Sequence, residues 1–139
     1  MKIKTIVFII MVLCVIPGLC FAGEVVVIVN PSVSETTLSK KEVGNIYLGK
    51  KTSWSDGSKI IFVILPGNAH ASFLKSYVGK TEAQFKTFWK KQVFTGKGSP
   101  PKEFDSDQAM VEFVAQTAGA IGYVSEGADV SKVKTITIN

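Results

Sequence analysis

The segment Gly67–Ser72 holds the groups of this chain that are best placed to bind a small ligand. It follows the apolar run Ile60–Leu65 and Pro66, and an amphipathic stretch comes after it. A helix that begins here leaves about four backbone N–H groups without partners inside the helix, at the positive end of its dipole. Small residues alternate with side chains that can donate hydrogen bonds: Gly67, Asn68, Ala69, His70, Ala71 and Ser72. The pattern predicts an anion site at a junction between a strand and a helix.

Two further residues are candidates for the same ligand site. Ser32 follows the apolar run that ends at Val29, and Lys97 lies in the glycine-rich loop 95–101. Ser32 could donate a hydrogen bond and Lys97 could add positive charge. The pattern also fits a simple turn in which Asn68 caps the helix and nothing binds. Both interpretations remain open at this point.

Other chemistry has little support in the sequence. His70 and Ser72 have no carboxylate nearby that could complete a hydrolase triad. Asp105 and Asp107 fit the start of a helix better than a pair of catalytic carboxylates. The chain has one histidine, and a transition-metal site needs three or four ligands. We therefore expect a non-enzymatic protein with no catalytic residue, no metal and no cofactor.

The first 22 residues predict a secretory signal peptide. Lys2 and Lys4 precede the apolar run Ile6–Ile16, and small residues near Ala22 predict cleavage after that position. The run is short for a membrane-spanning helix. We expect a periplasmic protein whose single domain covers residues 23–139. Both cysteines lie in the predicted signal, so the mature domain would have no disulfide.

The charge of the chain argues against nucleic-acid binding. All 16 basic residues are lysines, and the net charge of +5 falls to +3 when Lys2 and Lys4 leave with the signal. Without arginine, the bidentate contact that a guanidinium makes to phosphate is absent. No basic helix with interleaved aromatic residues is present either.

The pattern along the mature chain alternates apolar strands with capped helices. Strands are expected at 24–29, 60–65, 120–124 and 133–138, the last of them at a sheet edge. Helices are expected to follow the capping boxes at Ser39 and Thr81, to run from about Ala69 to Tyr77, and to begin near Asp105. On the helix after Thr81, the predicted buried residues are Phe85, Phe88, Trp89 and Val93.

These elements predict an α/β fold, a three-layer sandwich with a mostly parallel sheet. Ligands bind such sheets outside the carboxyl ends of the strands. On that rule, Asn30-Pro31-Ser32 and the segment Gly67–Ser72 should lie at the same edge of the sheet.

Two motifs resemble a known family. The segment Leu38–Ile60, LSKKEVGNIYLGKKTSWSDGSKI, is similar to one lobe of the phosphate-binding proteins of ABC phosphate importers. The segment Ala118–Val124, AGAIGYV, resembles the closing Pro-Gly-Ala-Ile-Gly-Tyr-Val signature of the same lobe. In order and at this spacing, they resemble one lobe of a type II periplasmic-binding protein. NPSVS, YLGKKTSWSDG and FTGKGSPP further resemble short, single-lobe exported members.

The resemblance implies a solute-binding function, with two departures. Family members close two lobes over the anion, and they carry an Arg and an Asp before a Gly-Ser-Gly-Thr-Ser-like motif. Here Leu65–Ser72 has neither charged residue, and Ser72 and Gly67 retain the character of the motif. We therefore expect weak binding of phosphate or a similar anion, with a membrane transporter, a sensor protein or a second copy of the chain as partner. The alternative is an adaptor or sensory lobe that has lost the anion site.

Overall fold

The computed structural model describes residues 25–139, and its centre is a five-stranded sheet. The strands lie in the order β4-β3-β5-β1-β6. A separate pair joins β2 to β7 in parallel. The strands are β1 (Val25–Val29), β2 (Thr37–Leu38), β3 (Ile61–Ile64), β4 (Lys102–Glu103), β5 (Ala120–Ser125), β6 (Lys134–Thr135) and β7 (Thr137–Ile138). The predicted signal peptide lies outside the described residues.

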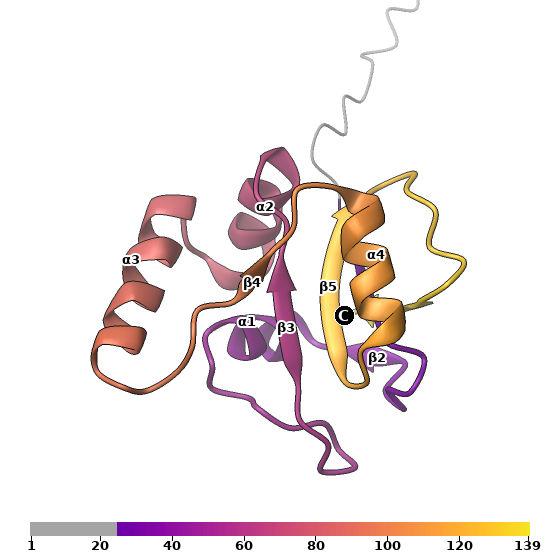
Figure 1. Cartoon of the computed structure of the whole chain (residues 1–139), viewed down its shortest axis with the longest axis horizontal. Coiled ribbons are helices and arrows are strands. Elements are labelled where there is room, and N and C mark those ends of the chain that lie inside the picture. The colour runs from indigo at the N-terminus through magenta and orange to yellow at the C-terminus, as the bar shows by residue number, and fades with distance from the viewer. Residues whose placement is uncertain (1–24) are drawn as a thin grey trace, which may run out of the picture.

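The helices alternate with these strands along the chain. Their bounds are α1 (Lys40–Tyr47), α2 (Asn68–Phe73), the π-helix η1 (Leu74–Val78), α3 (Glu82–Phe94) and α4 (Asp107–Gln116). Figure 1 shows β3 and β5 of the five-stranded sheet between α2 and α4. Ser39 and Thr81 each form the predicted capping box, with Glu42 and Gln84 respectively. Both predicted helix starts are therefore confirmed. A capping box involves only the N-cap residue and the residue three positions later, so a short sequence motif is enough to predict it.

The sheet is mostly parallel, as predicted, and β1 is the exception. β3 runs parallel to both β4 and β5, whereas β1 is antiparallel to both β5 and β6. Four strands of the sheet thus run in one direction and β1 runs in the other. The carboxyl end of β1 consequently lies opposite the carboxyl ends of β3 and β5, which matters for the predicted site.

Alternate residues of β5 face two different helical layers. A Cβ atom on Gly122 would meet Met110 and Val114 of α4, so this face of the sheet lies against α4. The neighbouring Tyr123 stacks on Phe73 of α2, with ring centroids 4.0 Å apart. Since successive residues of a strand point to opposite faces, helices cover both faces of the sheet. The predicted three-layer α/β sandwich is confirmed.

An aromatic cluster fills the layer between the sheet and α1, α2 and η1. Tyr47 of α1 contacts Phe62, Phe73 and Tyr123, with ring centroids 5.1, 4.6 and 5.9 Å away. Its hydroxyl donates to the carbonyl of Val63 at 2.9 Å. Buried aromatic rings in such contacts stabilise a core beyond the area that they bury. This cluster fixes α2 against the end of β3.

Close packing of α1 on η1 depends on a glycine. A Cβ atom on Gly44 would overlap the carbonyl oxygen of Tyr77, the last-but-one residue of η1. The sequence predicted one helix over 69–77, ended by Gly79. The structure confirms this extent but divides the segment into α2 and η1, and Gly79 ends it with φ 72°.

Two other expectations need correction. Val93, predicted as buried, is 41% exposed at the last turn of α3. The single edge strand expected at 133–138 is divided between two sheets. β6 pairs with β1 and β7 with β2, and the buried Ile136 between them donates its amide to Val27.

Candidate functional site

The junction between β3 and α2 is open to solvent at its tip. Gly67 is the N-cap residue of α2, with φ 117° and ψ −160°, a conformation that L side chains rarely adopt. Pro66, Gly67 and Asn68 are exposed, and no atom lies within 4 Å of the position that a Cβ on Gly67 would take. The junction is therefore sterically open at Gly67.

The first turn of α2 differs from the other helix starts in its capping. Side chains of Ser39, Thr81 and Ser106 accept an amide N–H at the starts of α1, α3 and α4. No side chain caps α2. The first three amides of a helix have no acceptor inside it, so those of Asn68, Ala69 and His70 remain available to an outside acceptor. Gly67, and not Asn68, occupies the N-cap position.

Within the second half of the segment, His70 points into the core, whereas Ala71 is exposed and Ser72 is half-buried. His70 is 6% exposed and Phe73 is fully buried. The Nδ1 atom of His70 is hydrogen-bonded to the hydroxyl of Tyr123, which also accepts the amide of Leu65 at 3.1 Å. The side chain of His70 therefore fastens α2 to β5 and does not share the exposed tip with Gly67. This placement corrects the expectation that His70 donates to an anion there.

Burial sets the protonation of this buried pair. Burial lowers the pKa of His70, an effect that the negative charges of Glu82 and Glu103 oppose. Burial also raises the pKa of Tyr123 above its ordinary value, while the amide of Leu65 acts in the other direction. Both side chains are consequently neutral near pH 7.

Ser32 lies at the opposite edge of the sheet from Gly67. Val29, at the end of β1, pairs with Ile121 near the start of β5, and Ile61 at the start of β3 pairs with Ala120. The prediction that Ser32 shares an edge with the α2 start is wrong, because β1 is antiparallel. Ser32 instead accepts the amide of Gly119 at 3.4 Å.

Asn30, just before it, has a structural role at the same edge. Its side-chain Nδ2 donates to the carbonyls of Val114 and Ala115 at the end of α4, at 2.8 and 3.1 Å. Its Oδ1 atom accepts the amide of Ser32 at 2.8 Å.

Lys97 is also separated from the α2 start. It follows α3, whose first turn lines the same hollow as Ala71 of α2. The 13 residues of α3 span about 20 Å, and they carry the chain from α2 toward the other end of the molecule (Figure 1). The structure thus brings Gly67, Asn68 and Ala69 together but adds neither Ser32 nor Lys97 to them.

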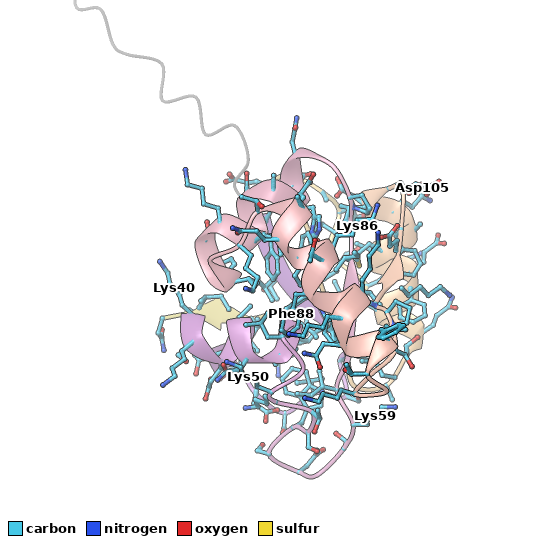
Figure 2. All side chains as sticks on the ribbon, turned by 90° about the vertical axis from the view of Figure 1, so that its left-hand side faces the viewer. Lys40, Lys50, Lys59, Lys86, Phe88 and Asp105 are labelled. Carbon is cyan, nitrogen blue, oxygen red and sulfur yellow. The ribbon has the colours of Figure 1, made fainter. Side chains whose placement is uncertain are left out.

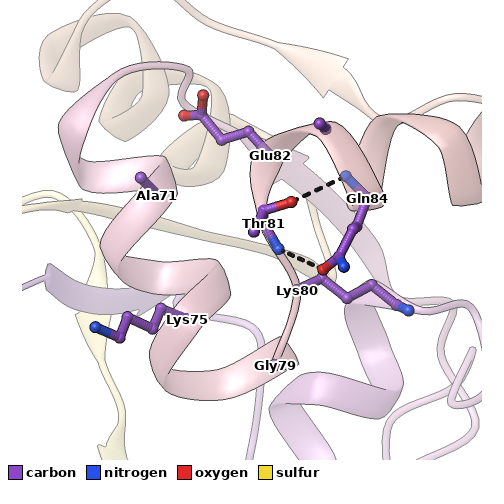
Figure 3. A pocket seen from close by; sticks show the side chains of 8 residues that line it. Ala71, Lys75, Gly79, Lys80, Thr81, Glu82 and Gln84 are labelled. Atoms are coloured by element: carbon purple, nitrogen blue, oxygen red, sulfur yellow. Dashed lines mark hydrogen bonds between the residues drawn. The ribbon is translucent and has the colours of Figure 1, made fainter.

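Ala71 and the turn after η1 line a shallow hollow with a volume of about 650 Å³ (Figure 3). Lys75 and Lys80 both line it, but in this view they extend in opposite directions. The backbone amide of Thr81 donates to Gln84 Oε1 at 3.0 Å, and the backbone amide of Gln84 donates to Thr81 Oγ1 at 3.2 Å. Glu82 adds a carboxylate. Since the ammonium groups do not converge, this hollow is a weaker anion site than the uncapped α2 start.

The lysines on the α3 side are spread out. Figure 2 shows Lys40, Lys50, Lys59 and Lys86 scattered over this view rather than gathered in one patch. Within residues 25–139, no three His, Cys, Asp or Glu side chains are grouped so that they could hold a metal ion. No helix in this part of the chain is long and apolar enough to cross a membrane.

The sequence of the chain matches the PBP superfamily domain over residues 19–138. The chain belongs to the PBP superfamily. The match covers most of the chain and confirms the resemblance to periplasmic-binding proteins that the two motifs indicated. No curated protein matches this PBP superfamily chain at a significant level.

Solved phosphate-binding proteins share the fold. The ABC-type phosphate transport receptor of Vibrio cholerae is 20% identical, with a TM-score of 0.57 over 82% of this chain and 45% of the receptor. PstS of Borrelia burgdorferi is 16% identical, with a TM-score of 0.65 over 83% and 47%. A Clostridium perfringens protein, named as a phosphate ABC transporter substrate-binding protein and solved with bound phosphate, is 18% identical, with a TM-score of 0.62 over 82% and 44%.

This PBP superfamily chain spans less than half of the length of these three proteins. The partial coverage fits a single lobe of the two-lobed fold. At such low identity the likeness establishes the fold, and the ligand has to be argued from the residues of this chain.

Sequence reasoning missed the contact between His70 and Tyr123. The two residues are 53 positions apart, so no local spacing connects them. The Tyr in the AGAIGYV motif was the available signal, because a buried tyrosine hydroxyl requires a partner.

Proposed function

We propose that this chain is an exported, non-enzymatic solute-binding protein that binds phosphate or a similar small anion weakly where β3 meets α2. The uncapped first turn of α2 is the observation that carries the proposal. Backbone N–H groups of Asn68, Ala69 and His70 can donate to the anion, and the helix dipole favours negative charge at this end. The side chain of Asn68 is exposed and can add a donor.

Weak binding follows from the geometry of a single lobe. An anion at the exposed tip of α2 keeps water on one side, whereas good small-molecule sites bury most of the ligand surface. The missing Arg and Asp remove the charged contacts of the family motif. The membrane component of a transporter, or a second copy of this chain, would supply the other wall. In this proposal, residues 1–22 direct export of the chain as a signal peptide, which is then cleaved after Ala22.

A second candidate function is an adaptor or sensory lobe that acts through a membrane protein and binds no anion. The placement of His70, Ser32 and Lys97 away from the α2 tip favours it, because these predicted side chains do not join the exposed amides.

Replacing Asn68 with Pro tests which function holds. Asn68→Pro removes one amide donor at the first helical position, where proline is well tolerated. Asn68→Ala keeps this amide and serves as the matched control. Because a hydrogen bond to a charged group is worth more than a neutral one, we expect Asn68→Pro to bind phosphate about tenfold more weakly than Asn68→Ala. Calorimetric titration at constant ionic strength measures the difference.

Equal affinities for the two variants would show that the Asn68 amide does not contact the anion. If the unmodified protein releases no heat and instead captures a membrane sensor or transporter subunit, the adaptor function replaces the solute-binding one.

A further inference from the structure

A groove runs between α3 and the edge of the sheet formed by β3 and β4, and it shares Glu82 with the shallow hollow. Its volume is about 690 Å³, which lies within the range of sites for small molecules. Phe94 at its rim is 92% exposed. The apolar walls come mainly from Pro66, Phe85, Val93, Phe94, Pro100 and Pro101.

One polar side chain in this groove has an unused hydrogen-bond donor. His70 lines the groove although it is 6% exposed. The Tyr123 hydroxyl accepts the amide of Leu65, and His70 Nδ1 is the acceptor available for the hydroxyl proton. A neutral imidazole carries one ring proton, which must then be on Nε2. Within residues 25–139, the Nε2–H group has no hydrogen-bond partner.

The charges around the groove balance one another. Glu82 and Glu103 carry negative charge and Lys86 and Lys90 carry positive charge. No ion pair joins these four side chains in the part of the chain that the structure describes. The groove therefore has no net charge to attract an anion, in contrast to the tip of α2.

We propose that this groove binds a neutral aromatic molecule that carries a carbonyl oxygen. The apolar walls of Phe85, Phe94 and the prolines accept a flat ring, and the carbonyl accepts the Nε2–H bond of His70. A charged ligand would lose its hydration against apolar walls without gaining a counter-charge. The groove and the α2 tip thus select different classes of ligand. A groove that binds no aromatic molecule would not contradict anion binding at the α2 tip, and the reverse also holds.

The test uses two probes of nearly identical shape. Acetophenone carries a carbonyl, whereas α-methylstyrene has a methylene group in its place. Each is titrated into the purified protein while the ring signals of His70, Phe85 and Phe94 are followed by NMR. We expect saturable shifts at these rings with both probes and about fivefold tighter binding of acetophenone, because only its oxygen accepts the His70 bond.

Single substitutions distinguish the contribution of the apolar walls to binding from that of the His70 hydrogen-bond donor. Phe94→Ala removes an exposed apolar wall of the groove and should lower the affinity for both probes about threefold. Thr87→Ala, at an exposed position of α3 outside the groove, should leave both affinities unchanged. His70→Phe should make the two affinities equal. If this variant fails to fold, the comparison of probes on the unmodified protein still decides the proposal.

Three results would overturn the proposal. The first is equal affinity of the unmodified protein for the two probes, and the second is no shift at the groove rings. The third is dimerisation in light scattering that perturbs the same rings without any probe, which would make a second copy of the chain the occupant.

Discussion

Replacing Gly119 with Ala is expected to destabilise the protein by about 3 kcal/mol. Gly119 has φ 77°, and a Cβ atom there would overlap the carbonyl oxygen of Lys59. The carbonyl of Gly119 also accepts the indole N–H of Trp54 at 2.9 Å and the amide of Ile61 at 3.1 Å. The substitution thus combines backbone strain with a clash against neighbouring backbone, at the start of β3 and β5. Denaturant unfolding measures the loss.

Gly57→Ala is the matched control for this effect. Gly57 has a similar φ of 86°, but no atom lies within 4 Å of its added Cβ. This variant should lose about 1 kcal/mol from backbone strain alone. Equal losses for Gly57→Ala and Gly119→Ala would contradict the close approach of Lys59 to Gly119.

Replacing Phe73 with Ala is expected to cost about 4 kcal/mol of unfolding free energy. Phe73 is fully buried and its ring contacts Tyr47 and Tyr123, with centroids 4.6 and 4.0 Å away. Its removal leaves a cavity between α1, α2 and β5. Because Tyr123 holds His70, we also expect the ring signals of His70 to shift in the NMR spectrum of this variant.

Phe94→Ala is the control for Phe73→Ala. The Phe94 side chain is 92% exposed, so its removal should change the stability by less than about 0.5 kcal/mol. A loss of several kcal/mol at Phe94, or none at Phe73, would mean that the aromatic cluster is not the core of the fold.

Local features of this fold are readable from the sequence. The capping boxes at Ser39 and Thr81 and the glycine after η1 act within one helical turn, so their residue types predict them directly. The motifs at Leu38–Ile60 and Ala118–Val124 predict the family, and the match over residues 19–138 confirms it.

Features that depend on residues far apart in the sequence cannot be predicted from local motifs. The apolar run of β1 has the same pattern in either direction, and its antiparallel pairing with β5 moves Ser32 away from Gly67. β4 consists of two exposed charged residues, and it forms because Val63 and Ile64 lie beside it. His70 turns inward because Tyr123 offers a partner from β5. The residues predicted for one site are therefore divided in the structure, which places Ser32 and the side chain of His70 away from the exposed start of α2.

The most direct test of the proposed anion site is a phosphate titration followed by the amide shifts of the purified protein. We predict saturable shifts, with millimolar affinity, at the amides of Asn68, Ala69 and His70, which have no acceptor inside the helix. The amides of Thr81 and Gln84, which are already hydrogen-bonded, should move little. Shifts confined to the region of Lys75 and Lys80, or no saturable shift at Asn68 and Ala69, would contradict a binding site at the start of α2.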